Sequence, residues 1–157
     1  MSWNPLYGFF VGQWQGGGMI MDYSAEQLFV NSFIRKKRRE RLWYELTTPG
    51  KRYDGISRFC HQSAELLDPS KIKLEGTDMD RNPIFEDFLR DHDEECFVLS
   101  PEFYPEVQQL PLKDAVRYAS MSTDAALIIG SNFAVVYGEA MKGGRDKFLC
   151  VTDGDGA

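Results

Sequence analysis

The sequence predicts a single α+β domain, with N-terminal helices and a mixed or antiparallel sheet that ends in a C-terminal three-stranded meander. Three observations support this fold class. The chain has 157 residues, which suits one domain. The stretch from Ala25 to Leu46 contains neither glycine nor proline, which favours a helix. Three apolar runs separated by glycine-containing turns follow in the last third, which favours adjacent strands.

Composition divides the chain into three parts. Residues 1–18 form an aromatic segment that ends in the three glycines 16–18, and the first charged residue is Asp22. Two interpretations stay open, a peptide fused before Met19 or a natural N-terminal strand. Residues 19–152 are expected to form the α+β domain, and residues 153–157 a flexible tail. The first part offers a set of apolar side chains that would need to pack on this molecule or on a second copy, namely Trp3, Leu6, Tyr7, Phe9, Phe10 and Trp14.

The first half of the domain is expected to be helical. We predict a helix from about Ser24 to Leu46 and leave open a break near Ser32, with Pro49-Gly50 ending it. Gly55 is expected to interrupt the chain again. A second short helix is then expected to begin at Ser57 and run through Leu67.

Positive charge is concentrated within these helices. Residues 35–58 hold nine basic and three acidic residues, a net charge of +6, whereas the whole chain has a net charge of −6. Such a segment binds a protein partner or nucleic acid, or it is a solvated face paired with acidic residues of its own molecule. Its residues Lys51, Arg52 and Arg58 are expected to form an anion pocket together with His61. The candidate binding residues are Arg35, Lys36, Arg38, Arg39, Arg41, Lys51, Arg52, Arg58 and His61.

Negative charge is concentrated between Asp78 and Glu95, where eight acidic and two basic residues give a net charge of −6. The segment is not a calcium-binding EF-hand loop, because Pro83 occupies the position that requires glycine and Leu89 the position that requires glutamate. It is expected to neutralise the basic helix, either within one molecule or between two.

The last third is expected to form most of the sheet. The pattern of residues 111–121 predicts an amphipathic helix that covers it. The three strands of the meander are expected at residues 125–129, 133–137 and 147–151. Further strands are expected at residues 71–74 and 96–99.

The three cysteines, Cys60, Cys96 and Cys150, form no CxxC motif and are expected to be buried free thiols, as in a protein of a reducing compartment. No apolar run reaches the roughly 18 residues of a membrane-spanning helix. The N-terminus also lacks the pattern of a secretory signal, so we expect a cytoplasmic protein.

No catalytic, metal-binding or cofactor-binding motif is present in the sequence, and we predict no catalytic residue, metal or cofactor. The leading hypothesis is a small cytosolic, non-enzymatic protein that binds a protein or peptide, in the manner of an adaptor, inhibitor or immunity protein. Its N-terminal segment offers a route to a homo-oligomer. The alternative is a nucleic-acid-binding regulatory protein that uses the basic helix 35–41.

Overall fold

The computed structural model describes residues 3–4, 9–10, 13–15, 18–20, 23–101, 107–139 and 144–152, with the side chains of residues 23–101, 108–139 and 144–152. The predicted α+β fold is confirmed. The helices are α1 (Ser24–Phe33), α2 (Lys36–Thr47), α3 (Arg52–His61), α4 (Ser63–Leu66), α5 (Pro83–Asp91) and α6 (Leu112–Met121), with short 3-10 turns η1 (Pro69–Lys71) and η2 (Met79–Arg81). The strands are β1 (Trp3–Asn4), β2 (Phe9–Phe10), β3 (Gln13–Gln15), β4 (Gly18–Ile20), β5 (Ile72–Glu75), β6 (Glu95–Leu99), β7 (Val107–Pro111), β8 (Ala126–Ile129), β9 (Phe133–Tyr137) and β10 (Lys147–Val151).

One antiparallel sheet organises the molecule, with strand order β1-β2-β7-β6-β8-β9-β10-β5. Strands β8, β9 and β10 are neighbours in both sequence and space, so the predicted three-stranded meander is confirmed. Strand β7 was not expected from the sequence. It pairs with β6 on one side and with the backbone of β2 on the other. The backbones of β3 and β4 form a separate two-stranded ribbon.

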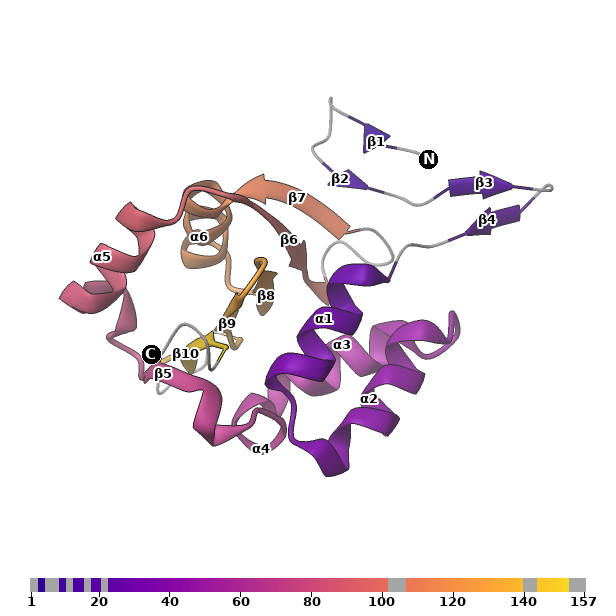
Figure 1. Ribbon diagram of the computed structural model, residues 1–157, viewed down its shortest axis with the longest axis horizontal. Coiled ribbons are helices and arrows are strands. Elements are labelled where there is room, and N and C mark those ends of the chain that lie inside the picture. The colour runs from indigo at the N-terminus through magenta and orange to yellow at the C-terminus, as the bar shows by residue number, and fades with distance from the viewer. Residues whose placement is uncertain are drawn as a thin grey trace.

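Helices cover both faces of this sheet (Figure 1). Alternate residues of each strand point to opposite faces, which gives two apolar cores. Leu127 and Ile129 of β8 pack with the helices α1 to α4. Ala126 and Ile128 pack with α5 and α6 on the opposite face. The chain is therefore a three-layer arrangement of helices, sheet and helices.

The predicted helix over residues 24–46 is two helices, and the break, which the sequence had left open near Ser32, lies at Ile34 and Arg35. Ile34 is fully buried and forms an isolated antiparallel bridge with Leu67. The backbone N–H of Arg35 donates to Leu66 O (2.9 Å), and the N–H of Asp68 donates to Phe33 O (2.8 Å). This short pairing satisfies backbone groups that a continuous helix would have used, and it ties the α1–α2 junction to the end of α4.

The predicted interruption at Gly55 is wrong, because α3 runs through this residue from Arg52 to His61. Gly55 lies where α3 crosses α2, and a Cβ added there would lie 2.8 Å from Glu45 Cβ. The glycine therefore permits a close approach between two helices instead of ending one of them.

A partly buried polar network lies at the end of the meander where β9 ends and β10 begins. Tyr137 Oη donates to Asp80 Oδ1 (2.7 Å), and Lys147 Nζ donates to Asp80 Oδ2 (2.9 Å). Arg145 donates to the carbonyl oxygens of Ala119 (2.6 Å) and Ser122 (2.8 Å), which satisfies groups at the end of α6. Burial raises the pKa of Tyr137 well above its usual range. The network thereby links η2, α6 and the β9–β10 pair.

We expect Gly55→Ala to lower the free energy of unfolding by about 1–2 kcal/mol, because the overlap with Glu45 outweighs the higher helix propensity of alanine. Urea denaturation measures the change. Gly50→Ala is the control, since nothing lies within 4 Å of a Cβ at that position. Equal effects of the two substitutions would show that the helix crossing is not tight.

We expect Tyr137→Phe to lower the free energy of unfolding by about 1–2 kcal/mol at neutral pH, through loss of the hydrogen bond to Asp80. The raised pKa keeps the native phenol neutral, whereas in the unfolded chain it ionises above about pH 10. The stability contributed by Tyr137 is therefore complete below that pH and is lost as the pH rises further. Denaturation of the wild type and of Tyr137→Phe at neutral pH and near pH 10.5 tests this. The difference between their free energies of unfolding should be smaller at the higher pH, and an unchanged difference would contradict the prediction.

Candidate interaction surface

Helix α2 is buried on one side and exposes most of its basic side chains to solvent. Leu42 and Leu46 are buried in the core that α2 shares with α1 and α3, so the opposite side of the helix faces solvent. The first turn holds Lys36, Lys37 and Arg38, all exposed, and no acidic residue. The N-terminus of a helix already carries partial positive charge, so these three cations are electrostatically unfavourable neighbours.

Two of the nine predicted binding residues are occupied by backbone carbonyl groups. Arg35 Nε donates to Leu67 O (3.0 Å), and its Nη2 donates to Ala64 O (3.2 Å). Arg39 Nε donates to Ile34 O (2.8 Å). Both guanidinium groups thus brace the junction between α1, α2 and α4.

Three further arginines are engaged by carboxylates. Arg52 Nη2 lies 2.6 Å from Glu26 Oε2, and the two side chains are only 3% and 1% exposed. Arg52 Nη1 also donates to Leu46 O (3.0 Å). Glu45 of α2 contacts both Arg58 of α3 and, at 3.8 Å, Arg41 of its own helix. Part of the predicted basic surface is therefore neutralised locally.

The predicted anion pocket of Lys51, Arg52, Arg58 and His61 is not assembled as one cluster of free cations. Arg52 faces Glu26, Arg58 faces Glu45, and His61 Nε2 lies 3.3 Å from Glu139 Oε1. Lys51 is exposed at the start of α3. Among the described side chains, Lys36, Lys37, Arg38 and Lys51 form no ion pair.

Two residues of this surface, Lys37 and Tyr44, were not among the candidate binding residues chosen from the sequence. Lys37 and Tyr44 lie in line with Arg41 at positions i, i+4 and i+7 of α2, and such residues share one helix face. Tyr44 is 54% exposed. The spacing was readable from the sequence, but the exposure depended on knowing which face of α2 packs on α1 and α3.

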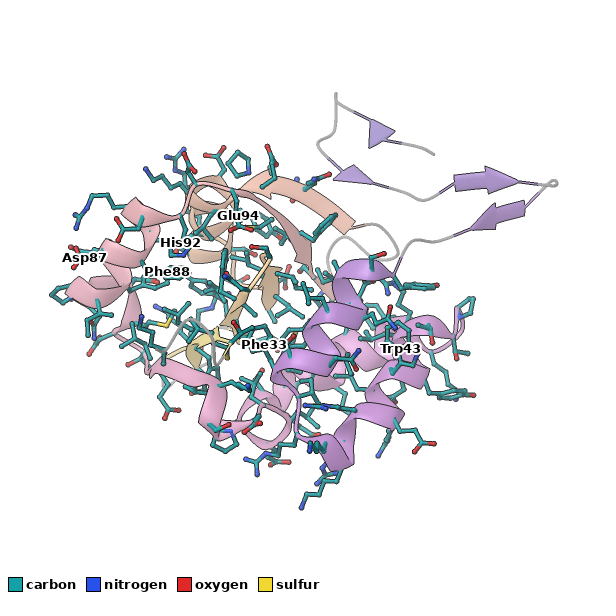
Figure 2. All side chains as sticks on the ribbon, viewed as in Figure 1. Phe33, Trp43, Asp87, Phe88, His92 and Glu94 are labelled. Atoms are coloured by element: carbon teal, nitrogen blue, oxygen red, sulfur yellow. The ribbon has the colours of Figure 1, made fainter. Side chains whose placement is uncertain are left out.

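The acidic segment does not neutralise this surface within one molecule. It forms η2, α5 and the start of β6, and α5 lies on the face of the sheet opposite to α2 (Figure 1). Figure 2 shows Asp87 of α5 and Trp43 of α2 near opposite ends of the molecule. Of the two alternatives left open for the acidic segment, neutralisation within one molecule is wrong.

A cleft of about 340 Å³ lies beside the His61–Glu139 pair and is lined also by Cys60, Thr77 and Asp146. Burial, together with the charge of Glu139, raises the pKa of the Cys60 thiol to about 12. The thiol is therefore protonated near neutral pH and is a poor nucleophile. Cys60, Cys96 and Cys150 are all free and buried, as predicted.

Within the described part of the chain, no three His, Cys, Asp or Glu side chains are grouped so that they could hold a metal ion. None of the described helices combines the length and the apolar character that crossing a membrane requires.

No protein-family model matches the chain, and neither curated proteins nor solved structures show a significant match to it.

We expect Arg52→Ala to lower the free energy of unfolding by about 3–5 kcal/mol, because it leaves the Glu26 carboxylate buried without its counter-ion. Lys51→Ala, one residue away and exposed, is the control and should change stability by less than about 0.5 kcal/mol. Chemical denaturation of both variants compares them. An effect of Arg52→Ala as small as that of Lys51→Ala would contradict the contribution of this buried ion pair.

Proposed function

We propose that this chain is a small, non-enzymatic binding protein that docks an acidic protein or peptide on the outer face of α2. The observation that carries the proposal is the exposed cluster of Lys36, Lys37 and Arg38, which forms no ion pair among the described side chains. The cluster is placed at the positive end of the helix dipole. Carboxylates of a partner would relieve this repulsion, which gives an acidic surface an advantage over a neutral one.

Two exposed aromatic side chains on α2 and α3 support a protein partner. Tyr44 and Tyr53 are large exposed aromatic residues on α2 and α3, and tyrosine and arginine are enriched at the centres of protein interfaces. A rigid helix anchored by Leu42 and Leu46 presents these groups without a large cost in ordering them on binding.

Nucleic acid is the second candidate, because Tyr44 in line with Lys37 and Arg41 resembles a stacking side chain beside phosphate-binding cations. The number of available cations favours a protein instead. Arg35, Arg39, Arg52 and Arg58 are engaged within the molecule, and an extended phosphate backbone is bound by many simultaneous contacts.

We place the protein in the cytoplasm, an assignment that its three free, buried cysteines support, since disulfides are favoured in oxidising compartments. Association of copies through the apolar N-terminal segment stays a prediction. Leu6 and Tyr7 lie outside the described residues, as does the predicted tail 153–157. Trp3, Phe9, Phe10 and Trp14 are described by their backbone alone, within β1, β2 and β3.

A photo-crosslinking amino acid at position 44 tests the proposal in cells that express the protein naturally. We expect a specific protein adduct at position 44, and none of the same mass when the crosslinker replaces Met121, which is also highly exposed but lies on α6. A nucleic-acid adduct would favour the second candidate. No specific adduct at position 44 would contradict both.

The same experiment with Lys36→Glu, Lys37→Glu and Arg38→Glu combined should lose the adduct, because like charges then face each other across the contact. The matched control reverses three exposed cations elsewhere, Lys73→Glu, Arg81→Glu and Lys113→Glu, with the same change in net charge. An adduct that disappears equally in both triple variants would show a dependence on net charge alone.

A further inference from the structure

The outer face of α2 carries an ordered pattern. Lys37, Arg41 and Tyr44 are exposed and follow one another at intervals of four and then three residues. These intervals place the three side chains in one row on the helix surface. We call this row the α2 ridge. It presents two positive charges followed by an aromatic ring.

Helix α5 carries a second exposed row with the complementary chemistry. Phe85 and Phe88 are buried against the sheet, and Ile84, Asp87 and Asp91 are exposed. Read backwards from Asp91, the intervals are again four and then three residues. We call this row the α5 ridge. It presents two negative charges followed by an apolar side chain, and Ile84 is 51% exposed.

We propose that the α2 ridge of one molecule docks antiparallel on the α5 ridge of a second copy. A single antiparallel register brings the members of the two rows together in order. The pairs are Lys37 with Asp91, Arg41 with Asp87, and Tyr44 with Ile84. In the same register, Glu40 of α2 and Arg90 of α5 lie next to the contact and on the same side of it. Their opposite charges therefore also attract each other. This inference rests on the proposed function, because it names one acidic partner for the same face.

One molecule cannot make this contact with itself. Its two ridges lie on opposite faces of the sheet and at opposite ends of the molecule (Figures 1 and 2). For the same reason, two copies cannot form both contacts at once. The contact is therefore head-to-tail, and each copy keeps one free ridge for a further copy.

The interactions that compete with this contact are weak. Arg41 is exposed and lies 3.8 Å from Glu45, which is also paired with Arg58 and so keeps a counter-ion when Arg41 leaves. Asp87 and Arg90 form an exposed pair within α5, and such pairs contribute little to stability. Exchange of these pairs costs little, and burial of Tyr44 against Ile84 removes apolar surface of both from water. The net charge of −6 opposes association at long range. The Debye length is about 10 Å at 0.1 M salt, so the nearest charges dominate once the ridges meet.

Sedimentation and light scattering of the full chain over a range of protein concentrations test the proposal. At about 0.1 M salt the average mass should rise from the 18.0 kDa of the monomer and continue past that of a dimer. At about 1 M salt, where the Debye length is about 3 Å, it should return towards the monomer. A wild-type protein that stays monomeric at millimolar concentration and low salt overturns the inference.

Two charge-reversal variants make the test specific for these ridges. Lys37→Glu with Arg41→Glu leaves both ridges acidic, and Asp87→Lys with Asp91→Lys leaves both basic. Each variant alone should bind itself at least about tenfold more weakly than the wild type, because like charges oppose each other in the contact. A mixture of the two should associate again, since opposite charges face each other across every ridge pair. Circular dichroism confirms folding, and two folded variants that do not associate on mixing overturn the inference.

The matched control is Lys113→Glu with Arg117→Glu on α6. It reverses two exposed cations at the same spacing, one of them 3.8 Å from a carboxylate as Arg41 is. This variant should associate like the wild type, and equal weakening would show that net charge, not the ridges, controls association. If the wild type is monomeric but still forms the protein adduct at position 44, the self-association is refuted and the proposed function still holds.

Discussion

The structure depends on the burial of the central strands on both faces. Every residue of β8 and β9 is buried, so side chains pointing in either direction must be covered by another layer. An antiparallel sheet with one face in water would show polar residues at alternate positions, and these strands show none. The chain must therefore supply a helical layer on each side. The helices α1 to α4 cover one face, and α5 and α6 cover the other.

This constraint also determines where the charges lie. The basic segment belongs to the helical layer that precedes the sheet in sequence, and most of the acidic segment lies in η2 and α5, within the opposite layer. The basic and acidic segments, which are separate in the sequence, therefore lie on opposite sides of the sheet. The sheet holds the two charged helices apart, which leaves their outward faces available to other molecules and not to each other.

The meander and its covering helix were readable from the sequence because their signals are local. Continuous apolar runs separated by glycine turns specify adjacent strands, and α6 begins only one residue after the expected Pro111. The features that were missed depend on contacts between distant residues. Gly55 does not end a helix. It allows the close approach of Glu45 on a neighbouring helix, and this contact is not visible in the sequence. The pairing of Ile34 with Leu67 could not be foreseen either, since neither residue signals a strand by itself.

The candidate surface was only partly predictable, because a sequence counts charges but does not tell which of them are engaged. The structure divides the basic segment largely by residue type. Arg35, Arg39, Arg52 and Arg58 bind carbonyl oxygens or carboxylates within the molecule, while Lys36, Lys37 and Lys51 are exposed. The planar guanidinium group suits this internal bracing, because its several donors contact more than one acceptor at once and it is less strongly hydrated than an ammonium group. A run of mixed lysine and arginine is therefore a poor guide to the size of a binding surface. The exposed row of Lys37, Arg41 and Tyr44 is a better one, since it follows from helix geometry once the buried face of α2 is known.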